Sequence, residues 1–212
     1  MSKRYFAAMI FLFCLYCISA HAVSFRYDLV IFTNNGLYND DPGVDFYFLL
    51  SEDGGLPKFE FHNESTIDNV ITQVYFDGSV LSGISIISQS SGVMFSAGAS
   101  PSNLPAGNEL TPSFSADFSA GAEPPPAFKG INNSLTEWLA ITMNMPSGIT
   151  FDDVRDALGT ADLRVGVHLQ GFGDDSSESA INDPREEIIP EPSVMSLLGL
   201  AGLGMLWRKK KK

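Results

Sequence analysis

Cysteine is almost missing from the 212-residue chain, and its two copies, Cys14 and Cys17, lie together in one apolar run near the N-terminus. Without that run, the chain contains no thiol, which excludes disulfides, thiol catalysis and cysteine metal ligands in the remainder. Histidine is scarce as well, since only His62 and His168 lie beyond the first 22 residues. Most nucleophilic and zinc mechanisms therefore lack the side chains that they need.

Positive charge is rare in the middle of the chain. Between Val23 and Pro192, six Lys and Arg face all 25 Asp and Glu, a net charge of −19. Such a surface repels phosphate backbones and anionic lipids, so we expect no nucleic-acid partner.

Long apolar runs are missing too: the two apolar segments near the chain ends have 14 residues each, fewer than the roughly 20 of an ordinary transmembrane helix.

The N-terminal apolar segment has the parts of a signal peptide. Two basic residues at positions 3–4 precede an apolar run over residues 5–18, and the small residues Ala20 and Ala22 follow. A helix of this length is about 21 Å long, against about 30 Å of hydrocarbon in a bilayer, which argues against a permanent anchor. We therefore predict that residues 1–22 are a signal peptide, with Ala20 and Ala22 forming the signal peptidase site.

The C-terminal end has three parts in a fixed order. The triplet Pro190, Glu191 and Pro192 is followed by an apolar stretch over residues 194–207. The chain then ends in five cations: Arg208, Lys209, Lys210, Lys211 and Lys212. The stretch predicts a single transmembrane helix that spans only with local thinning and snorkelling of its flanking cations. The cations mark the cytoplasmic side and act as a basic membrane stop.

This tripartite end, over residues 190–212, resembles the PEP-CTERM sorting signal of Gram-negative bacteria. The resemblance implies that an exosortase, a membrane cysteine protease-transpeptidase, recognises Pro190, Glu191 and Pro192 in a precursor anchored in the inner membrane. It also implies export to the cell surface or extracellular matrix and a link to exopolysaccharide, biofilm or floc formation. An ordinary stop-transfer anchor with a Pro-containing linker is the alternative.

Strand patterns fill the segment between the two ends. Short apolar or alternating runs, bounded by turn residues, recur about every 10 to 15 residues, which favours antiparallel pairing. They cover residues 25–31, 44–50, 58–62, 67–76, 84–87, 92–95, 114–118, 135–143 and 163–170. Thr150 and Asp153 resemble a capping box, and Gly159 is expected to close a helix of about eight residues. We predict a mainly β domain over residues 23–172, an antiparallel β-sandwich with one short helix.

Two further segments lack a strand pattern. Residues 96–126 are rich in Ser, Ala, Gly and Pro and predict a long surface connection. This stretch, with the segments around Gly130 and Leu163, loosely resembles passenger domains of other PEP-CTERM proteins, a resemblance that names no activity. Residues 173–189 are acidic and poor in large apolar side chains, so we predict a solvated acidic linker between the domain and the sorting signal.

Catalytic chemistry finds little support in this domain. His168 shares the polar face of its predicted strand with Arg164, and His62 shares one with Glu60. Either face could hold a ligand, although a solvated strand face is the simpler interpretation. No G-x-S-x-G elbow, P-loop, dinucleotide fingerprint or H-E-x-x-H motif is present. We therefore expect no enzyme and no catalytic residue, with a histidine-dependent secreted hydrolase as a remote alternative.

Acidic loops and aromatic side chains offer two binding hypotheses. Oxygen ligands gather in two groups: Asn39, Asp40, Asp41 and Asp45, and Asp174, Asp175 and Glu178. Solvated acidity is their simpler interpretation, so we expect no metal site or cofactor and at most weak calcium binding. Three aromatic residues are candidates for stacking on sugar rings: Tyr38, Tyr47 and Trp138. They keep a secreted carbohydrate-binding module open as an alternative, with core packing as the simpler explanation.

Together these observations lead to one hypothesis. The chain is expected to be an exported cell-surface or extracellular-matrix protein, structural rather than enzymatic. Exosortase is its expected processing partner, and exopolysaccharide is a candidate partner afterwards.

Overall fold

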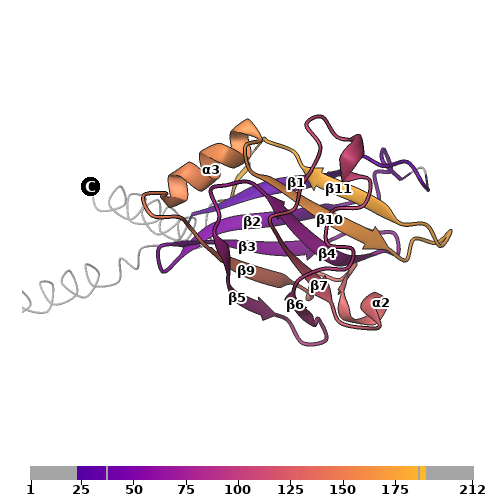
Figure 1. Cartoon of the computed structure of the whole chain (residues 1–212). Helices are drawn as coiled ribbons and strands as arrows, with labels where there is room; N and C mark the ends of the chain where they lie inside the picture. Colours follow the sequence, from indigo (N-terminus) through magenta and orange to yellow (C-terminus); the bar gives the residue numbers. More distant parts are fainter. Residues whose placement is uncertain (1–22, 37, 186, 190–212) are drawn as a thin grey trace, which may run out of the picture. The chain divides into compact units, whose positions relative to one another are not determined.

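The computed structural model describes residues 23–36 and 38–185, and the backbone of residues 187–189 (Figure 1). The predicted signal peptide and sorting signal, residues 1–22 and 190–212, lie outside the described residues. Ser24–Ile188 form one compact unit, which contains every element discussed below except the last residue of the final strand. Among the described residues, no helix has the length and apolar composition that crossing a membrane requires.

A single 12-stranded antiparallel sheet forms the unit. Ten of its strands follow the order β5-β9-β3-β2-β1-β11-β10-β4-β7-β6, while β12 pairs with β1 and β8 with β4. The strands are β1 Ser24–Ile31, β2 Phe46–Asp53, β3 Leu56–Asn63, β4 Val70–Asp77, β5 Gly83–Gln89, β6 Phe95–Ala97, β7 Phe118–Ala122, β8 Ile131–Asn132, β9 Leu139–Asn144, β10 Arg164–Gln170, β11 Glu178–Asn182 and β12 Glu187–Ile189. The predicted mainly antiparallel β architecture is confirmed.

Strand β1 joins the two halves of this sheet. Its first half pairs with β2, where Phe25 lies opposite Leu50, and its second half pairs with β11, where Leu29 lies opposite Asn182. The sheet folds over itself at this shared strand and is nearly barrel-shaped (Figure 1). The predicted sandwich of two separate sheets is corrected accordingly, because one continuous strand belongs to both layers.

Aromatic rings from opposite walls meet in the interior. Strand β3 alternates strictly, so Phe59 and Phe61 are fully buried while Lys58, Glu60 and His62 turn outward. The Phe59 ring meets the edge of Phe76 on β4, with 5.1 Å between ring centroids. Edge-to-face contacts of this kind suit the quadrupoles of the two rings, and they hold β3 and β4 together across the core.

The predicted helix is present as α3, Phe151–Thr160. Its capping box is confirmed: the backbone N–H of Asp153 donates to Thr150 Oγ1 at 3.3 Å, and the backbone N–H of Thr150 donates to Asp153 Oδ2 at 2.8 Å. The predicted end at Gly159 is wrong, because the helix continues to Thr160 and the left-handed residue is Ala161, with φ 61°. Two short helical segments were not predicted: η1 Gly107–Glu109 and α2 Pro126–Lys129.

The predicted acidic linker contains a central strand. Strand β11, Glu178–Asn182, pairs with both β1 and β10, and Ala180 on it is fully buried. The linker prediction over residues 173–189 is therefore wrong for this strand, and the predicted domain end at residue 172 is too early. The polar side chains of this strand resemble those of a solvated segment in the sequence, but the buried Glu178 and Asn182 accept hydrogen bonds inside the fold.

Candidate functional site

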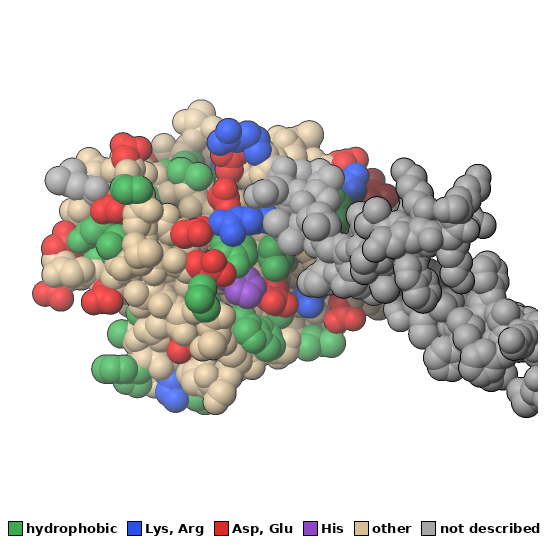
Figure 2. Space-filling view, turned by 180° about the vertical axis from the view of Figure 1, so that it is seen from behind, with side chains coloured by type: hydrophobic (Ala, Val, Ile, Leu, Met, Phe, Trp, Pro, Cys, Tyr) green, Lys and Arg blue, Asp and Glu red, His purple; other side chains and the backbone are tan. Residues whose placement is uncertain are grey.

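Charged and aromatic side chains gather on the outer face of β1, β2 and β3. We call the set Arg26, Asp28, Asp45, Tyr47, Glu60, His62 and Glu64 the outer-face cluster. Acidic, basic and histidine side chains are visible together in the middle of one face of the molecule (Figure 2). Tyr47 and His62 lie opposite each other in the β2–β3 ladder and stack, with centroids 5.0 Å apart and 17° between the rings. The Arg26 guanidinium lies 3.7 Å from the Tyr47 ring centroid.

Each polar group of the outer-face cluster has a partner within the cluster or beside it. Arg26 binds Asp28 through Nε at 2.8 Å and Asp45 through Nη2 at 2.7 Å. The Tyr47 hydroxyl donates to Glu64 Oε1 at 2.6 Å, and His62 Nε2 lies 3.2 Å from Glu60 Oε1.

These contacts also set the ionisation of the cluster. Burial, reinforced by the bond to Glu64, raises the pKa of Tyr47, so its hydroxyl stays neutral. The hydrogen bond from His62 lowers the pKa of Glu60, which is therefore ionised at neutral pH. The outer-face cluster is therefore an internally hydrogen-bonded network with a net negative charge, since it contains one arginine and four carboxylates.

The predicted sugar-stacking aromatics lie in two places. Tyr47 is only 8% exposed, and its ring is covered by Arg26 and His62. Trp138 directly precedes Leu139, which faces inward opposite Phe61, so by alternation Trp138 faces outward on the same side as His62. Tyr38 stacks instead on Phe172, with 4.3 Å between centroids. The structure thus brings Tyr47, His62 and Trp138 to one face and leaves Tyr38 apart from them.

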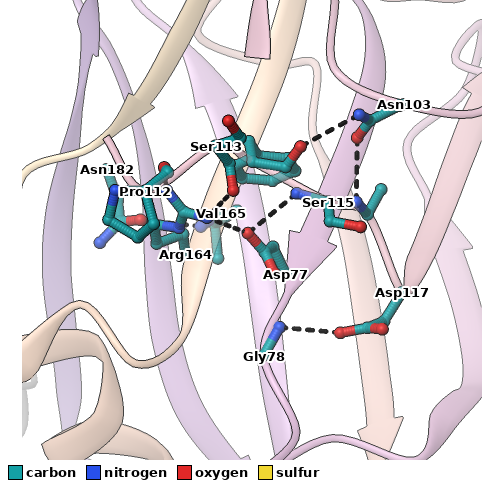
Figure 3. A network of polar contacts seen from close by, with 12 residues as sticks. Asp77, Gly78, Asn103, Pro112, Ser113, Ser115, Asp117, Arg164, Val165 and Asn182 are labelled. Carbon is teal, nitrogen blue, oxygen red and sulfur yellow. Dashed lines mark hydrogen bonds and ion pairs between the residues drawn. The ribbon is translucent and has the colours of Figure 1, made fainter. Parts of the chain in front are cut away.

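The long connection after β6 folds onto the outer face of β4 and β10 (Figure 3). Arg164 at the start of β10 donates to the carbonyl oxygens of Pro112 at 2.6 Å and Ser113 at 2.8 Å, and it also pairs with Asp77. The same Asp77 carboxylate accepts the backbone N–H of Ser115 at 3.1 Å. One partly buried ion pair thereby fixes the backbone of Pro112, Ser113 and Ser115 against the sheet.

A second apolar cluster underlies this connection. Leu104 and Phe114 from the connection pack with Tyr75 of β4 into a buried group separate from the main core. Leu104 lies over Gly166 of β10, where a Cβ atom would come within 2.7 Å of Leu104 Cδ2. The polar face of β10 is therefore covered by the chain itself. Both interpretations of that face, a ligand site and a solvated surface, are corrected by this packing.

His168 lies beneath the same cover. It is 8% exposed, and its Nδ1 is 2.9 Å from Gln73 Oε1. Gln73 in turn donates from Nε2 to the carbonyl oxygen of Ser100 at 2.5 Å, which links the histidine to the covering connection. Burial lowers the pKa of His168, so the side chain is neutral near pH 7. His168 is thus buried, neutral and tied through Gln73 to the covering connection.

The buried His168 predicts acid sensitivity. An unfolded chain takes up a proton at this residue below about pH 6.5, whereas the folded chain does so only at lower pH, so the free energy of unfolding falls as the pH drops. We expect His168→Gln to remove up to about 1 kcal/mol of the stability difference between pH 7.5 and pH 5.5. Urea unfolding of the native protein and of His168→Gln at pH 7.5 and pH 5.5 measures this difference. If the stability of both proteins depended equally on pH, the result would contradict a buried, neutral His168.

Three of the acidic groups considered for calcium bind other groups of the protein. Glu178 is 1% exposed, accepts the backbone N–H of Gly36 at 2.5 Å and is also bound by the Thr33 hydroxyl. Asp41 Oδ1 accepts the backbone N–H of Gly43 at 2.7 Å, and Asp45 pairs with Arg26. Within residues 23–36 and 38–185, no group of three or more His, Cys, Asp or Glu is placed to hold a metal ion.

Comparison with known proteins identifies the C-terminal end. Residues 189–211 match the family described as the PEP-CTERM protein-sorting motif, which confirms the resemblance seen in the sequence. No curated protein and no solved structure matches the chain. The matched segment starts at Ile189, the last residue of β12, so the motif follows the final strand directly in the sequence. The chain therefore carries a PEP-CTERM sorting motif, which marks an exported protein that exosortase processes at the membrane.

Proposed function

We propose that the chain is a structural protein of the cell surface or extracellular matrix, associated with exopolysaccharide or biofilm. A cleaved signal peptide delivers it, the C-terminal helix holds the precursor in the inner membrane, and exosortase then releases or transfers the folded domain. The observation that carries this proposal is the sorting motif at residues 189–211, which follows the last strand of a compact β domain.

The contacts of the described residues support a non-enzymatic role. His168 is buried under the covering connection, and His62 is stacked on Tyr47 inside a paired network. The buried carboxylate of Glu178 holds backbone rather than facing a cavity. A general base needs access to a substrate proton, whereas His168 is buried and Nε2 of His62 lies against Glu60. We therefore propose that the domain acts through its surface and its stability.

Removing both prolines of the motif tests the sorting route. We expect Pro190→Ala with Pro192→Ala to leave the uncut precursor in the inner-membrane fraction, because the extended backbone that the prolines impose is lost from the protease substrate. Pro184→Ala is the matched control, since Pro184 is an exposed proline just before the motif. Immunoblots of fractionated native-host cells give the result. Normal processing of the double variant would contradict the proposal.

A carbohydrate-binding module is the second candidate. The observation that favours it is the half-buried indole of Trp138, which directly precedes Leu139 of β9, the strand paired with the β3 strand of His62. Such an indole suits stacking on a sugar ring. Titration of the protein with soluble exopolysaccharide from its host distinguishes the two functions. Saturable binding that Trp138→Ala abolishes supports the module, whereas absence of saturable binding supports the purely structural role.

A further inference from the structure

The sheet does not close on itself, and we call the gap between its two end strands, β5 and β6, the seam. The strand order ends at β5 on one side and at β6 on the other, and these two strands face each other without forming a ladder. At one end of the seam the backbone N–H of Phe95 donates to Gln89 Oε1 at 2.7 Å. Elsewhere a groove of about 350 Å³ opens, lined by Ile84, Ala97, Gly98, Asp117, Phe118 and Ser119. Among the described strand pairs, β5 pairs only with β9, so its other edge presents a row of backbone N–H and C=O groups.

The seam is the least charged part of an acidic protein. Residues 78–116 contain one charged side chain, Glu109, and β5, β6 and β7 contain none. In Figure 2 the lower part of the molecule, where Figure 1 places β5, is mostly uncharged, while acidic side chains dominate the middle and one edge. Two copies of a chain with this net negative charge repel each other over most of their surface. They can approach closely along the seam, where that repulsion is weakest.

Strand β5 lacks most of the features that keep edge strands apart, although it has a bulge between Ile84 and Ile86. Natural edges are protected by Lys, Pro, inward charges or a covering segment. The sequence of β5, Gly-Ile-Ser-Ile-Ile-Ser-Gln, has no charge and no proline, and it is rich in β-branched residues. Its Ile86 is 56% exposed, although an isoleucine on a monomer surface gains nothing from exposure. These properties favour pairing with another strand over contact with water.

We propose that β5 pairs antiparallel with β5 of a second copy of the chain, joining two barrels through one continuous sheet. An antiparallel pair of identical strands is self-complementary, so residue i of one copy lies opposite residue j of the other and j lies opposite i. Only a residue on the two-fold axis meets its own copy, and we place Ile86 there. Backbone hydrogen bonds supply the attraction, as in other cases of strand addition, and Ile86 of each copy becomes buried. The biological meaning of this contact rests on the proposed structural role, since a matrix protein can assemble through contacts between its copies. The contact itself does not require sorting.

Engineered cysteines test the contact in the full chain. A background with Cys14→Ser and Cys17→Ser leaves no native thiol, so Ile86→Cys introduces the only one. We expect this variant to form intermolecular disulfide dimers in its native host, because facing strands hold the two thiols at high effective concentration. Val30→Cys on the doubly paired β1 and Leu135→Cys in a loop, 47% and 79% exposed in the native protein, are the controls. They should give about tenfold less dimer.

Two outcomes overturn the proposal. Leu135→Cys or Val30→Cys cross-linking as strongly as Ile86→Cys would show random collision or another interface. Failure of Ile86→Cys to cross-link, in a protein that folds normally, would exclude the proposed pairing along β5.

A charged substitution at Ile86 is a second test of pairing along β5. Ile86→Lys in the background without native thiols should give a monomer by analytical ultracentrifugation where the parent protein gives a dimer, since two ammonium groups then meet at the two-fold axis. The same experiment in a strain without exosortase separates the hypotheses, because the dimer should persist there whether or not sorting depends on the C-terminal motif.

Discussion

We expect Ala180→Asp to destabilise the exported domain severely, whereas Arg185→Asp, in the same acidic segment, should leave its stability nearly unchanged. Ala180 is fully buried in β11, where it lies opposite Ile31 on one side and Val167 on the other. A carboxylate there has no cation beside it, and an uncompensated buried charge costs about 3–5 kcal/mol. Since whole domains are stable by only about 5–15 kcal/mol, this single change removes much of the total. Arg185 is exposed, so its replacement removes only a surface ion pair with Asp183.

The two variants separate the observed fold from the linker that the sequence predicts. A solvated linker would accept aspartate at either position without effect. Periplasmic yield and circular dichroism melting curves of both variants give the answer. Equal melting temperatures for the two would contradict the placement of β11 between β1 and β10.

Gly130→Ala destabilises the domain by about 3 kcal/mol, while Gly159→Ala stabilises it by about 1 kcal/mol. Gly130 follows α2 with an ordinary φ of −74°, so its need is steric rather than conformational. A Cβ atom there would come closer than 3.0 Å to the carbonyl oxygen of Ile71 and to a methyl group of Val70. Displacing a backbone oxygen costs more free energy than moving a flexible side chain, so α2 would have to shift away from β4. At Gly159, inside α3, an added Cβ meets nothing within 4 Å.

Guanidinium unfolding curves of the two Gly→Ala variants measure this pair of opposite shifts. The direction of the stability change at Gly159 is the informative result. Replacing glycine by alanine stabilises a helix interior but destabilises a helix end in the left-handed conformation. A destabilised Gly159→Ala variant would mean that the helix ends where the sequence suggests, and a stable Gly130→Ala variant would contradict the close packing of α2 on β4.

Local patterns in the sequence predicted the local structure well. The alternation that turns Phe59 and Phe61 inward is complete within one strand, and the Thr150–Asp153 capping box is complete within four residues. Such features need no knowledge of the rest of the fold, because the backbone geometry alone determines which side chains share a face or a helix end. The sorting motif is readable for the same reason, since it is a linear signal at residues 189–211.

Features that depend on distant partners could not be predicted in this way. Glu178 is a charged residue in a buried strand only because Thr33 and Gly36, more than 140 residues away, supply its hydrogen bonds. The packing of the connection after β6 on β10 likewise depends on Leu104, which lies against Gly166, a residue without a side chain. The Gly within a run of alternating apolar residues was a signal of close approach, but nothing nearby in the sequence indicated which segment approaches.

The intact mass of the mature protein, measured from host strains with and without exosortase, tests the central claim most directly. We predict a product that begins at Val23 and ends near Pro190–Pro192 in the strain with the enzyme, because the motif follows the last strand directly. In the strain without it, the chain should still carry the basic residues 208–212 and fractionate with the inner membrane. A chain that retains residues 208–212 in both strains would contradict exosortase sorting and leave an ordinary membrane-anchored domain.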